Sequence, residues 1–338
     1  MRAYGRRKVL ALAAGVLTAV TACSGDAPPA PTRSAAAVTG APSPSPAEPE
    51  VTREEAAQEF SDFILTDAGL RAESPYEGRL LQAQDLTTGG QWPLTQSAYL
   101  STSFAPPRHR WGAPTLYVPR FPQGEPAPWF SVLVTRDERP TLLTFARSDH
   151  WRLSSAAELL PGQELPEIAL DSGGYATVVA PDDKSVTISP QFMGPVHASV
   201  AETGKSGVTA DLLAAGPHTT EVADQIADSR DKAKADGFSY DSIFSADNFP
   251  VYALRTANGG ALIQYSLSRT TTTTTKTAED DYISVPDQAR WAIDSEVLRR
   301  SLRLVETHQY ATAVPPLTAP AAAPVIAHDG ALTRASGT

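Results

Sequence analysis

The first 50 residues limit most strongly what this chain can fold into, because almost none of them can enter a globular core. Residues 9–22 form a 14-residue run of apolar and small side chains that follows four basic residues among the first eight. As a helix this run would span about 21 Å, less than the roughly 30 Å of a bilayer core. It therefore predicts an export signal over residues 1–22. Residues 24–50 hold seven prolines and no aromatic side chain, so 23–50 is predicted to be a disordered linker.

The end of the export signal carries a specific motif. Small residues lead into the single cysteine of the chain, in the order Val20-Thr21-Ala22-Cys23. This stretch resembles the lipobox of bacterial lipoproteins. The resemblance implies a diacylglyceryl group on Cys23, cleavage just before it, and palmitate-type acyl chains that hold the protein on the extracytoplasmic face of the membrane. Two or more such chains anchor a protein stably, at about 0.8 kcal/mol per buried methylene. The alternative is an ordinary secretory signal with an incidental thiol.

Charge and cysteine content exclude several classes of protein. The 338 residues include 28 basic and 38 acidic side chains, a net charge of −10. Loss of residues 1–22 would leave 24 basic against 38 acidic side chains, a net −14. Nucleic-acid binding needs a surplus of Lys and Arg, so no nucleic-acid partner is expected. A single cysteine excludes an internal disulfide or a thiolate metal cluster.

Helix and strand patterns begin directly after the linker. The run Thr52-Arg53-Glu54-Glu55 has the form of a capping box and predicts a helix from there to about Ala72. Strands are predicted at residues 115–118, 129–136 and 141–147, the last two flanking a polar turn at 137–140.

A similar order returns later in the chain. A helix is expected to begin at Thr219 or Thr220 and to stop at Gly237. It is followed by a hairpin formed by residues 251–256 and 261–270 around an Asn-Gly turn, and by strands at 302–314 and 324–328. We therefore predict an α+β fold with two tandem modules, residues 51–204 and 205–338, each a helix packed on a curved antiparallel sheet. The alternative is that the two parts are unrelated domains that share this simple order of helix and hairpin.

Two resemblances accompany this pattern. A helix across a curved sheet resembles the cystatin-like and nuclear-transport-factor-like folds, which implies a space between helix and sheet that binds a small molecule in some members and is filled in others. The whole arrangement also resembles uncharacterised actinobacterial lipoproteins, mainly at residues 213–219 and 331–337. That resemblance implies no particular activity.

The common catalytic motifs are absent from the sequence. It has no G-x-S-x-G elbow, no H-E-x-x-H, no phosphate-binding loop and no dinucleotide-binding glycine pattern, so no catalytic residue and no cofactor are predicted. Ser148-Asp149-His150 is interpreted as a polar turn, because neighbours on a strand face opposite ways. Ser229 and Lys232 are interpreted as part of a solvated helix face.

No metal site is predicted either. The six histidines are scattered, with no pair at the i, i+3 or i, i+4 spacing of a helical zinc site. Acidic groups at residues 279–281, and Asp236, Asp241 and Asp247 around a predicted turn, lack the spacing of a calcium loop. The run Thr270–Thr275 is expected in an edge strand, with a glycosylated or flexible loop as the alternatives.

One basic and aromatic stretch is the candidate ligand site. Arg108, Arg110, Trp111 and Arg120 combine guanidinium groups with an aromatic ring, a composition suited to an anionic cell-wall polymer. The alternative is that the aromatic residues pack the core while the arginines stay in water. The preferred function is a non-catalytic, lipid-anchored protein that binds an unknown ligand or an envelope protein. A cell-envelope hydrolase and a structural or assembly factor without a ligand pocket are the alternatives.

Overall fold

The computed structural model describes residues 49–71, 76–246, 248–276 and 282–338. The described residues belong to one compact unit. Within the described ranges the unit is α+β, as predicted, and is built on a nine-stranded antiparallel sheet in the order β1-β2-β3-β4-β11-β10-β7-β5, with β6 also pairing with β7. The helices are α1 (Arg53–Leu70), α2 (Gly78–Asp85), α3 (Gln91–Ser101), α4 (Pro190–Thr203) and α5 (Thr220–Ala235). The strands are β1 (Thr115–Tyr117), β2 (Trp129–Arg136), β3 (Arg139–Arg147), β4 (Trp151–Leu159), β5 (Phe238–Ser245), β6 (Tyr252–Arg255), β7 (Ala261–Thr275), β10 (Ser301–Val314) and β11 (Val325–Gly337), while β8 (Ile283–Ser284) and β9 (Val297–Leu298) form a separate pair.

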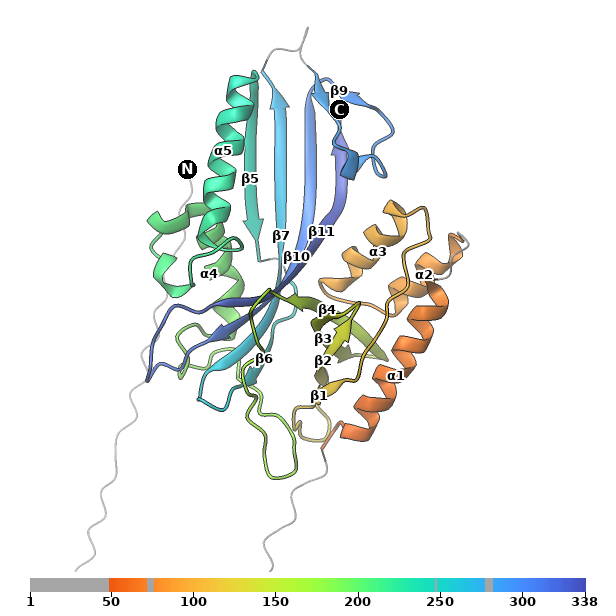
Figure 1. The fold of residues 1–338 in the computed structure, drawn as a ribbon, viewed down its shortest axis with the longest axis vertical. Helices are drawn as coiled ribbons and strands as arrows, with labels where there is room; N and C mark the ends of the chain where they lie inside the picture. Colours follow the sequence, from red (N-terminus) through yellow and green to blue (C-terminus); the bar gives the residue numbers. More distant parts are fainter. Residues whose placement is uncertain (1–48, 72–75, 247, 277–281) are drawn as a thin grey trace, which may run out of the picture. The chain divides into compact units, whose positions relative to one another are not determined.

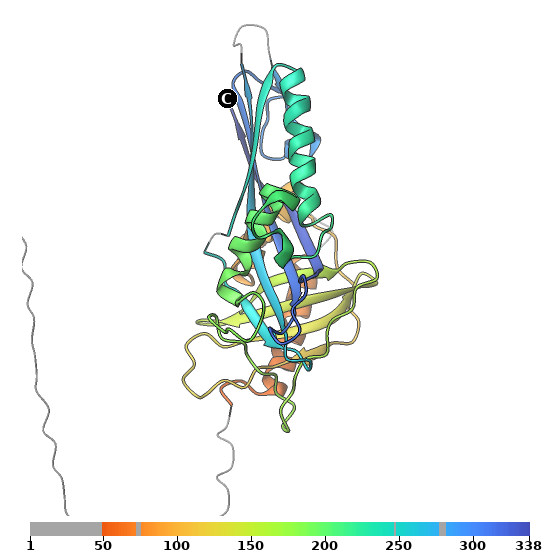
Figure 2. The ribbon, with the colours of Figure 1, turned by 90° about the vertical axis from the view of Figure 1, so that its left-hand side faces the viewer.

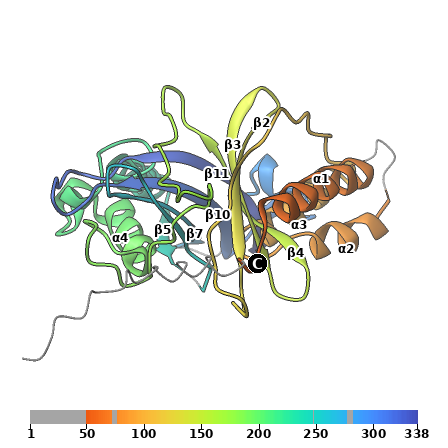
Figure 3. The same ribbon diagram turned by 90° about the horizontal axis from the view of Figure 1, so that it is seen from below.

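The three longest strands, β7, β10 and β11, lie side by side in the sheet (Figure 1). Helices α4 and α5 cover one face of these strands, and α5 runs alongside them (Figure 2). Helices α1 to α3 lie on the opposite face of the sheet, next to the shorter strands β1 to β4 that form its other end (Figure 3). The sheet therefore separates two layers of helices, each with its own apolar cluster.

Helix α1 forms where the capping box predicts it. The Thr52 hydroxyl accepts a hydrogen bond from the Glu55 amide at 3.0 Å, which satisfies one free amide at the helix start. The buried ring of Phe60 packs edge-on against Phe145 of β3, with ring centroids 6.2 Å apart. This contact fixes the helix on the β1–β4 part of the sheet.

The β2–β3 turn is tighter than predicted. Strand β3 begins at Arg139, two residues earlier than expected, so only Asp137 and Glu138 connect the strands. Both have positive φ angles, 51° and 72°, as a two-residue hairpin turn requires. Asp137 is useful there, because its carboxylate accepts hydrogen bonds from the His109 ring and the Arg110 amide. The Glu138 side chain makes no hydrogen bond or ion pair within the described residues, so nothing offsets the steric cost of its positive φ angle.

Replacement of Glu138 by Gly is expected to stabilise the protein by about 1 kcal/mol, because glycine adopts a positive φ without the steric penalty of a side chain. The measurement is the urea midpoint of the folded unit at neutral pH. Gly124 has a positive φ already, so Gly124→Ala is the opposite control and should lower the midpoint. An unchanged midpoint for Glu138→Gly would contradict the strain.

The second predicted helix and hairpin are also confirmed. Helix α5 ends before Gly237, whose φ is +85°, and β6 and β7 flank a turn with Gly259 at φ +84°. The predicted turn after Gly237 is wrong. Residues from Phe238 onward form β5 and pair with the far end of β7, so Asp241 lies in a strand.

The threonine run does not form an edge strand, and this prediction is wrong. Residues 270–275 belong to β7, which pairs with β10 on one side and with β5 on the other. The β-branched side chains suit this central position, because they pack against side chains of the neighbouring strands on both sides.

Strands from both sides of the predicted module boundary at residues 204 and 205 join the same sheet. Strand β4 pairs with β11 through only two residue pairs, Ala327 with Leu159 and His328 with Glu158. The division into modules 51–204 and 205–338 stays a prediction. No helix in the described part of the chain is long and apolar enough to cross a membrane.

Candidate functional site

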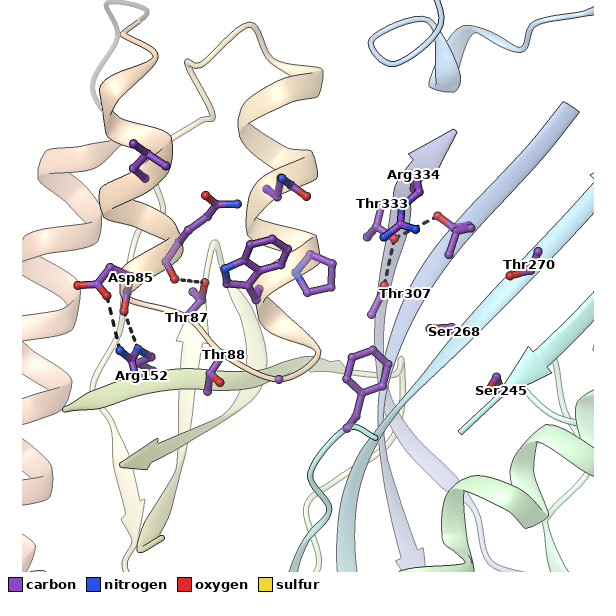
Figure 4. A pocket seen from close by; sticks show the side chains of 18 of the residues that line it. Asp85, Thr87, Thr88, Arg152, Ser245, Ser268, Thr270, Thr307, Thr333 and Arg334 are labelled. Carbon is purple, nitrogen blue, oxygen red and sulfur yellow. Dashed lines mark hydrogen bonds and ion pairs between the residues drawn. The ribbon is translucent and has the colours of Figure 1, made fainter. Parts of the chain in front are cut away.

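A groove of about 990 Å³ lies between α2–α3 and the strands of the long half of the sheet (Figure 4). Its helical wall comes from α2, α3 and the segment between them, and its floor from β5, β7, β10 and β11. The lining residues are Leu81, Gln84, Asp85, Thr87, Thr88, Gly89, Trp92, Pro93, Gln96, Arg152, Ser245, Phe249, Ser268, Thr270, Arg303, Val305, Thr307, Thr333 and Arg334. Hydroxyl groups and arginines dominate this list.

The segment between α2 and α3 fixes the helical wall on the sheet. The Thr88 amide donates to the Leu153 carbonyl, and the Leu153 amide donates to the Leu86 carbonyl, each at 2.9 Å. Gly90 then approaches the sheet so closely that a Cβ atom there would lie 2.2 Å from the Ser266 hydroxyl. Glycine is therefore needed at the start of α3 to bring Trp92 over the strands.

Gly90→Ala is expected to destabilise the folded unit by about 1–3 kcal/mol, since the added methyl group must displace α3 from Ser266. Thermal unfolding followed by circular dichroism measures this loss. Gly69→Ala is the matched control, because no atom lies within 4 Å of a Cβ there and the substitution favours the helix. Equal melting temperatures for Gly90→Ala and the wild type would contradict this close approach.

The floor of the groove is polar because alternate residues of the long strands carry hydroxyls. Thr307 is opposite Ser268 in the β10–β7 register, and its hydroxyl lies 3.1 Å from that of Thr333 on β11. The Thr333 hydroxyl in turn donates to the Val305 carbonyl at 3.1 Å. Figure 4 shows Ser245, Ser268 and Thr270 farther across the same floor. These groups offer a row of donors and acceptors to a ligand.

The arginines of the groove differ in their pairing. Arg152 bonds to Asp149 at 2.6 Å and lies 3.6 Å from Asp85, the one acidic residue among the described lining residues. Arg303 and Arg334 are exposed, and within the described residues neither has an ion pair or a side-chain hydrogen bond. The floor therefore presents two uncompensated positive charges in a chain of net charge −10.

A second hollow of about 960 Å³ lies on the other side of α3. Its cations are paired: Arg136 with Asp329 at 3.1 Å, Arg290 with Asp287 at 2.9 Å, and Arg71 with Asp67 at 2.8 Å. It therefore offers less free charge to a ligand than the groove does.

The four predicted ligand contacts do not come together. Trp111 packs against Phe60 and Phe63 and forms an isolated β-bridge with Arg136. Arg120 lies beyond the other end of β1, where its guanidinium donates a hydrogen bond to Asp171 at 2.6 Å. Arg108 donates to the Arg71 carbonyl at 3.0 Å, and Arg110 is exposed. None of the four lines the groove. Their role as ligand contacts stays a prediction, and the structure places them in two separate settings.

The other predicted features lie away from the groove. Ser148, Asp149 and His150 form the bend between β3 and β4. The Ser229 hydroxyl donates to the Gln225 carbonyl within α5, and Lys232 is exposed. Cys23, Asp247 and the acidic residues 279–281 lie outside the described residues.

A cluster of four histidines, which the sequence spacing did not reveal, lies between α4–α5 and the sheet. His197 comes from α4, His218 precedes α5, and His308 and His328 come from β10 and β11. The His218 and His328 rings lie 4.2 Å apart, and His308 Nδ1 lies 3.1 Å from His328 Nε2. The fold allows this because Gly330 has no side chain: a Cβ there would lie 2.4 Å from His308 Nδ1.

Hydrogen bonds fix the tautomer of the neutral His197 ring. Its Nε2 must donate to the His218 carbonyl at 2.6 Å, so Nδ1 accepts from the Tyr265 hydroxyl at 2.7 Å. Burial lowers the pKa of His197 to about 4. Burial, together with the neighbouring histidines, lowers the pKa of His328 to about 3, and burial also lowers that of His218. Among the described residues, no three His, Cys, Asp or Glu side chains are arranged to hold a metal ion.

The chain is similar to two lipoproteins of Streptomyces. An uncharacterised lipoprotein of Streptomyces coelicolor is 28% identical over 353 residues, covering 98% of this chain and 95% of the relative. An uncharacterised lipoprotein of Streptomyces avermitilis is 28% identical over 141 residues, covering 40% of each chain. These two relatives confirm the resemblance to uncharacterised actinobacterial lipoproteins. No solved structure matches, so the likeness to cystatin-like and nuclear-transport-factor-like folds stays a prediction. Residues 47–337 match a family described as a domain of unknown function, DUF8094, and the chain belongs to this family.

Proposed function

We propose that this protein is a non-catalytic binding protein, anchored by lipid on Cys23 to the extracytoplasmic face of the cell membrane, whose ligand occupies the groove between α2–α3 and the sheet. The observation that carries the binding function is the groove itself: about 990 Å³ of space lined by hydroxyls and by two arginines without acidic partners in the described residues. This volume is at the upper end of the roughly 300–1,000 Å³ typical of ligand sites.

The lining supports binding rather than hydrolysis. The groove hydroxyls belong to serines and threonines, yet no histidine is among the described lining residues. The Asp85 carboxylate lies beside Arg152, which holds it in an ion pair. A serine or threonine nucleophile needs an adjacent base to accept its proton, and the groove supplies none among these residues.

The anchor rests on the Val20-Thr21-Ala22-Cys23 motif and on relatives whose names describe them as lipoproteins. Cys23→Ala is expected to move the protein from the membrane fraction to the soluble fraction, lowering the membrane-bound share at least tenfold, because the acyl chains provide the attachment. Cell fractionation with immunoblotting measures the shift. Ser24→Ala keeps the cysteine and should leave the protein on the membrane. Unchanged membrane recovery of Cys23→Ala would contradict the anchor.

The binding function is tested by blocking the groove. Thr270 is half-buried on its floor, so Thr270→Trp would fill part of the space. Mass spectrometry of material that copurifies with the protein from native membranes should show a ligand with the wild type and its loss with Thr270→Trp. Ser284→Trp, an exposed position on β8, is the control for added aromatic surface. Equal ligand recovery from both variants would reject the groove as the binding site.

A further inference from the structure

We propose that the groove recognises an anionic saccharide chain, with Arg303 and Arg334 binding its acidic groups and the hydroxyl row and Trp92 binding its sugar units. This inference rests on the proposed binding function and specifies the chemistry of the ligand.

The positions of the two arginines point to an anion. Val305 pairs with Arg334 in the β10–β11 register, and Arg303 lies two residues before Val305 on β10. Arg303 and Arg334 are therefore diagonal neighbours on one face of the sheet, at a typical separation of about 7–8 Å. Two cations at this spacing repel each other unless an anion lies between or above them. Within the described residues no carboxylate does so, and Asp85 is occupied by Arg152.

The hydroxyl row points to a sugar. Ser268, Thr270, Thr307 and Thr333 come from three neighbouring strands and present hydroxyl groups along the floor. The Thr307–Thr333 contact and the bond from Thr333 to the Val305 carbonyl hold part of this row in place before a ligand arrives. A polyol can exchange hydrogen bonds with such a row, because each hydroxyl both donates and accepts.

Aromatic surface completes the site. Trp92 lines the groove on α3 and is 42% exposed, which is unusual for a residue whose ring favours burial. An indole can pack against the apolar face of a sugar ring while the charged groups of the ligand reach the arginines. Leu81, 72% exposed, extends this apolar rim on α2.

The same observations disfavour an acidic peptide. A peptide often binds a sheet by adding a strand to a free edge. Strands β7 and β10, which form most of the floor, are each paired along both sides, so they offer no such edge within the groove.

The test uses the full-length lipidated protein in detergent and isothermal titration with three probes: a hexamer of galacturonate, the neutral hexamer maltohexaose, and poly-glutamate of equal charge. We expect galacturonate to bind, with maltohexaose and poly-glutamate each at least tenfold weaker. Arg303→Gln and Arg334→Gln should each weaken galacturonate about tenfold, as the loss of a charged hydrogen bond implies. Trp92→Ala should weaken both saccharides. Arg299→Gln removes an exposed arginine that does not line the groove and should have no effect.

Several outcomes would overturn the inference. Equal binding of poly-glutamate would replace the saccharide by any polyanion or an acidic peptide, and equal binding of maltohexaose would remove the role of the arginines. Galacturonate binding that Arg303→Gln and Arg334→Gln leave unchanged, or no binding of any probe, would also reject it. The binding function is judged separately: it fails when no native ligand copurifies with the wild type, or when Thr270→Trp leaves that ligand in place.

Discussion

Lowering the pH from 7 to 5 is expected to reduce the free energy of unfolding by about 4 kcal/mol through the histidine cluster alone. The pKa of His197 is lowered to about 4 and that of His328 to about 3, whereas an unfolded histidine titrates near 6.5. Between these values the unfolded chain binds more protons than the native protein, so stability falls as the pH falls. At pH 5 each of these two histidines contributes a loss of about 2 kcal/mol.

The structural reason is that an added proton would either remove a hydrogen-bond acceptor or lie beside other histidine rings. A proton on His197 Nδ1 would remove the acceptor of the Tyr265 hydroxyl, which itself lies 2.8 Å from the Thr312 hydroxyl. A proton on His328 would face the rings of His218 and His308. Glu306 lies 3.9 Å from His308 Nε2 and 3.6 Å from Arg269, so its charge is shared with a guanidinium already.

Urea unfolding at pH 7, 6 and 5 measures this dependence. His328→Asn removes one of the two groups and should halve the loss between pH 7 and pH 5. His150→Asn changes a half-buried histidine outside the cluster and is the control for the loss of a histidine elsewhere in the chain. Stability that does not change between pH 7 and 5, or a slope that His328→Asn leaves intact, would contradict neutral burial of the cluster.

The sequence predicted those elements whose signals are local. The Thr52 capping box and the Asn258-Gly259 turn each act over a few residues, and the structure has α1 and the β6–β7 hairpin there. Helix α3 was missed, because its eleven residues include Pro93 and its stability comes from contacts with β4 and β11. Helix α4 was missed for a similar reason: Pro195 interrupts its pattern, while Met193 and Val200 pack into the core behind it.

The candidate site was not predictable from spacing. Thr307 and Thr333 are 26 residues apart and are brought together by the pairing of β10 with β11, whereas His197 and Tyr265 are 68 apart and are brought together by the packing of α4 on β7. The structure does not bring the basic and aromatic stretch together, because Trp111 packs against Phe60 and Arg120 is paired with Asp171, so its role as a ligand site stays a prediction. The two groove arginines without an ion pair in the described residues, Arg303 and Arg334, come instead from β10 and β11, 31 residues apart in the sequence.

Gln309→Met is expected to destabilise the protein by about 3 kcal/mol, since it removes the side chain that joins β10 to β4. Strands β4 and β11 share only two residue pairs, and beyond them the Ala156 amide bonds to Gln309 Oε1 at 2.8 Å. Gln309 Nε2 also donates to the Ser154 carbonyl at 3.3 Å. Gln309 is fully buried, so methionine keeps its volume but leaves these two backbone groups without partners, at about 1–3 kcal/mol each.

A second buried glutamine provides the matched comparison. Gln264 of β7 bonds to Thr144 of β3 at 2.7 Å and to Ser131 of β2 at 2.9 Å. Those two hydroxyls also lie 2.8 Å from each other, so they keep a partner when Gln264 is replaced. Gln264→Met should therefore lower the free energy of unfolding by only about 1 kcal/mol, and Gln288→Met, at an exposed position, by less than about 0.5 kcal/mol.

Urea unfolding gives the three free energies, and hydrogen exchange followed by mass spectrometry shows where protection is lost. If Gln309 couples the two parts of the sheet, Gln309→Met lowers protection in β3 and in β7 together, because neither part keeps its native contacts when β4 separates from β10. Protection lost from β4 alone would show that the residues before and after position 204 unfold independently, as separate modules do. A Gln309→Met protein as stable as the Gln288→Met control would contradict the argument that side-chain hydrogen bonds replace the missing strand pairing at this junction.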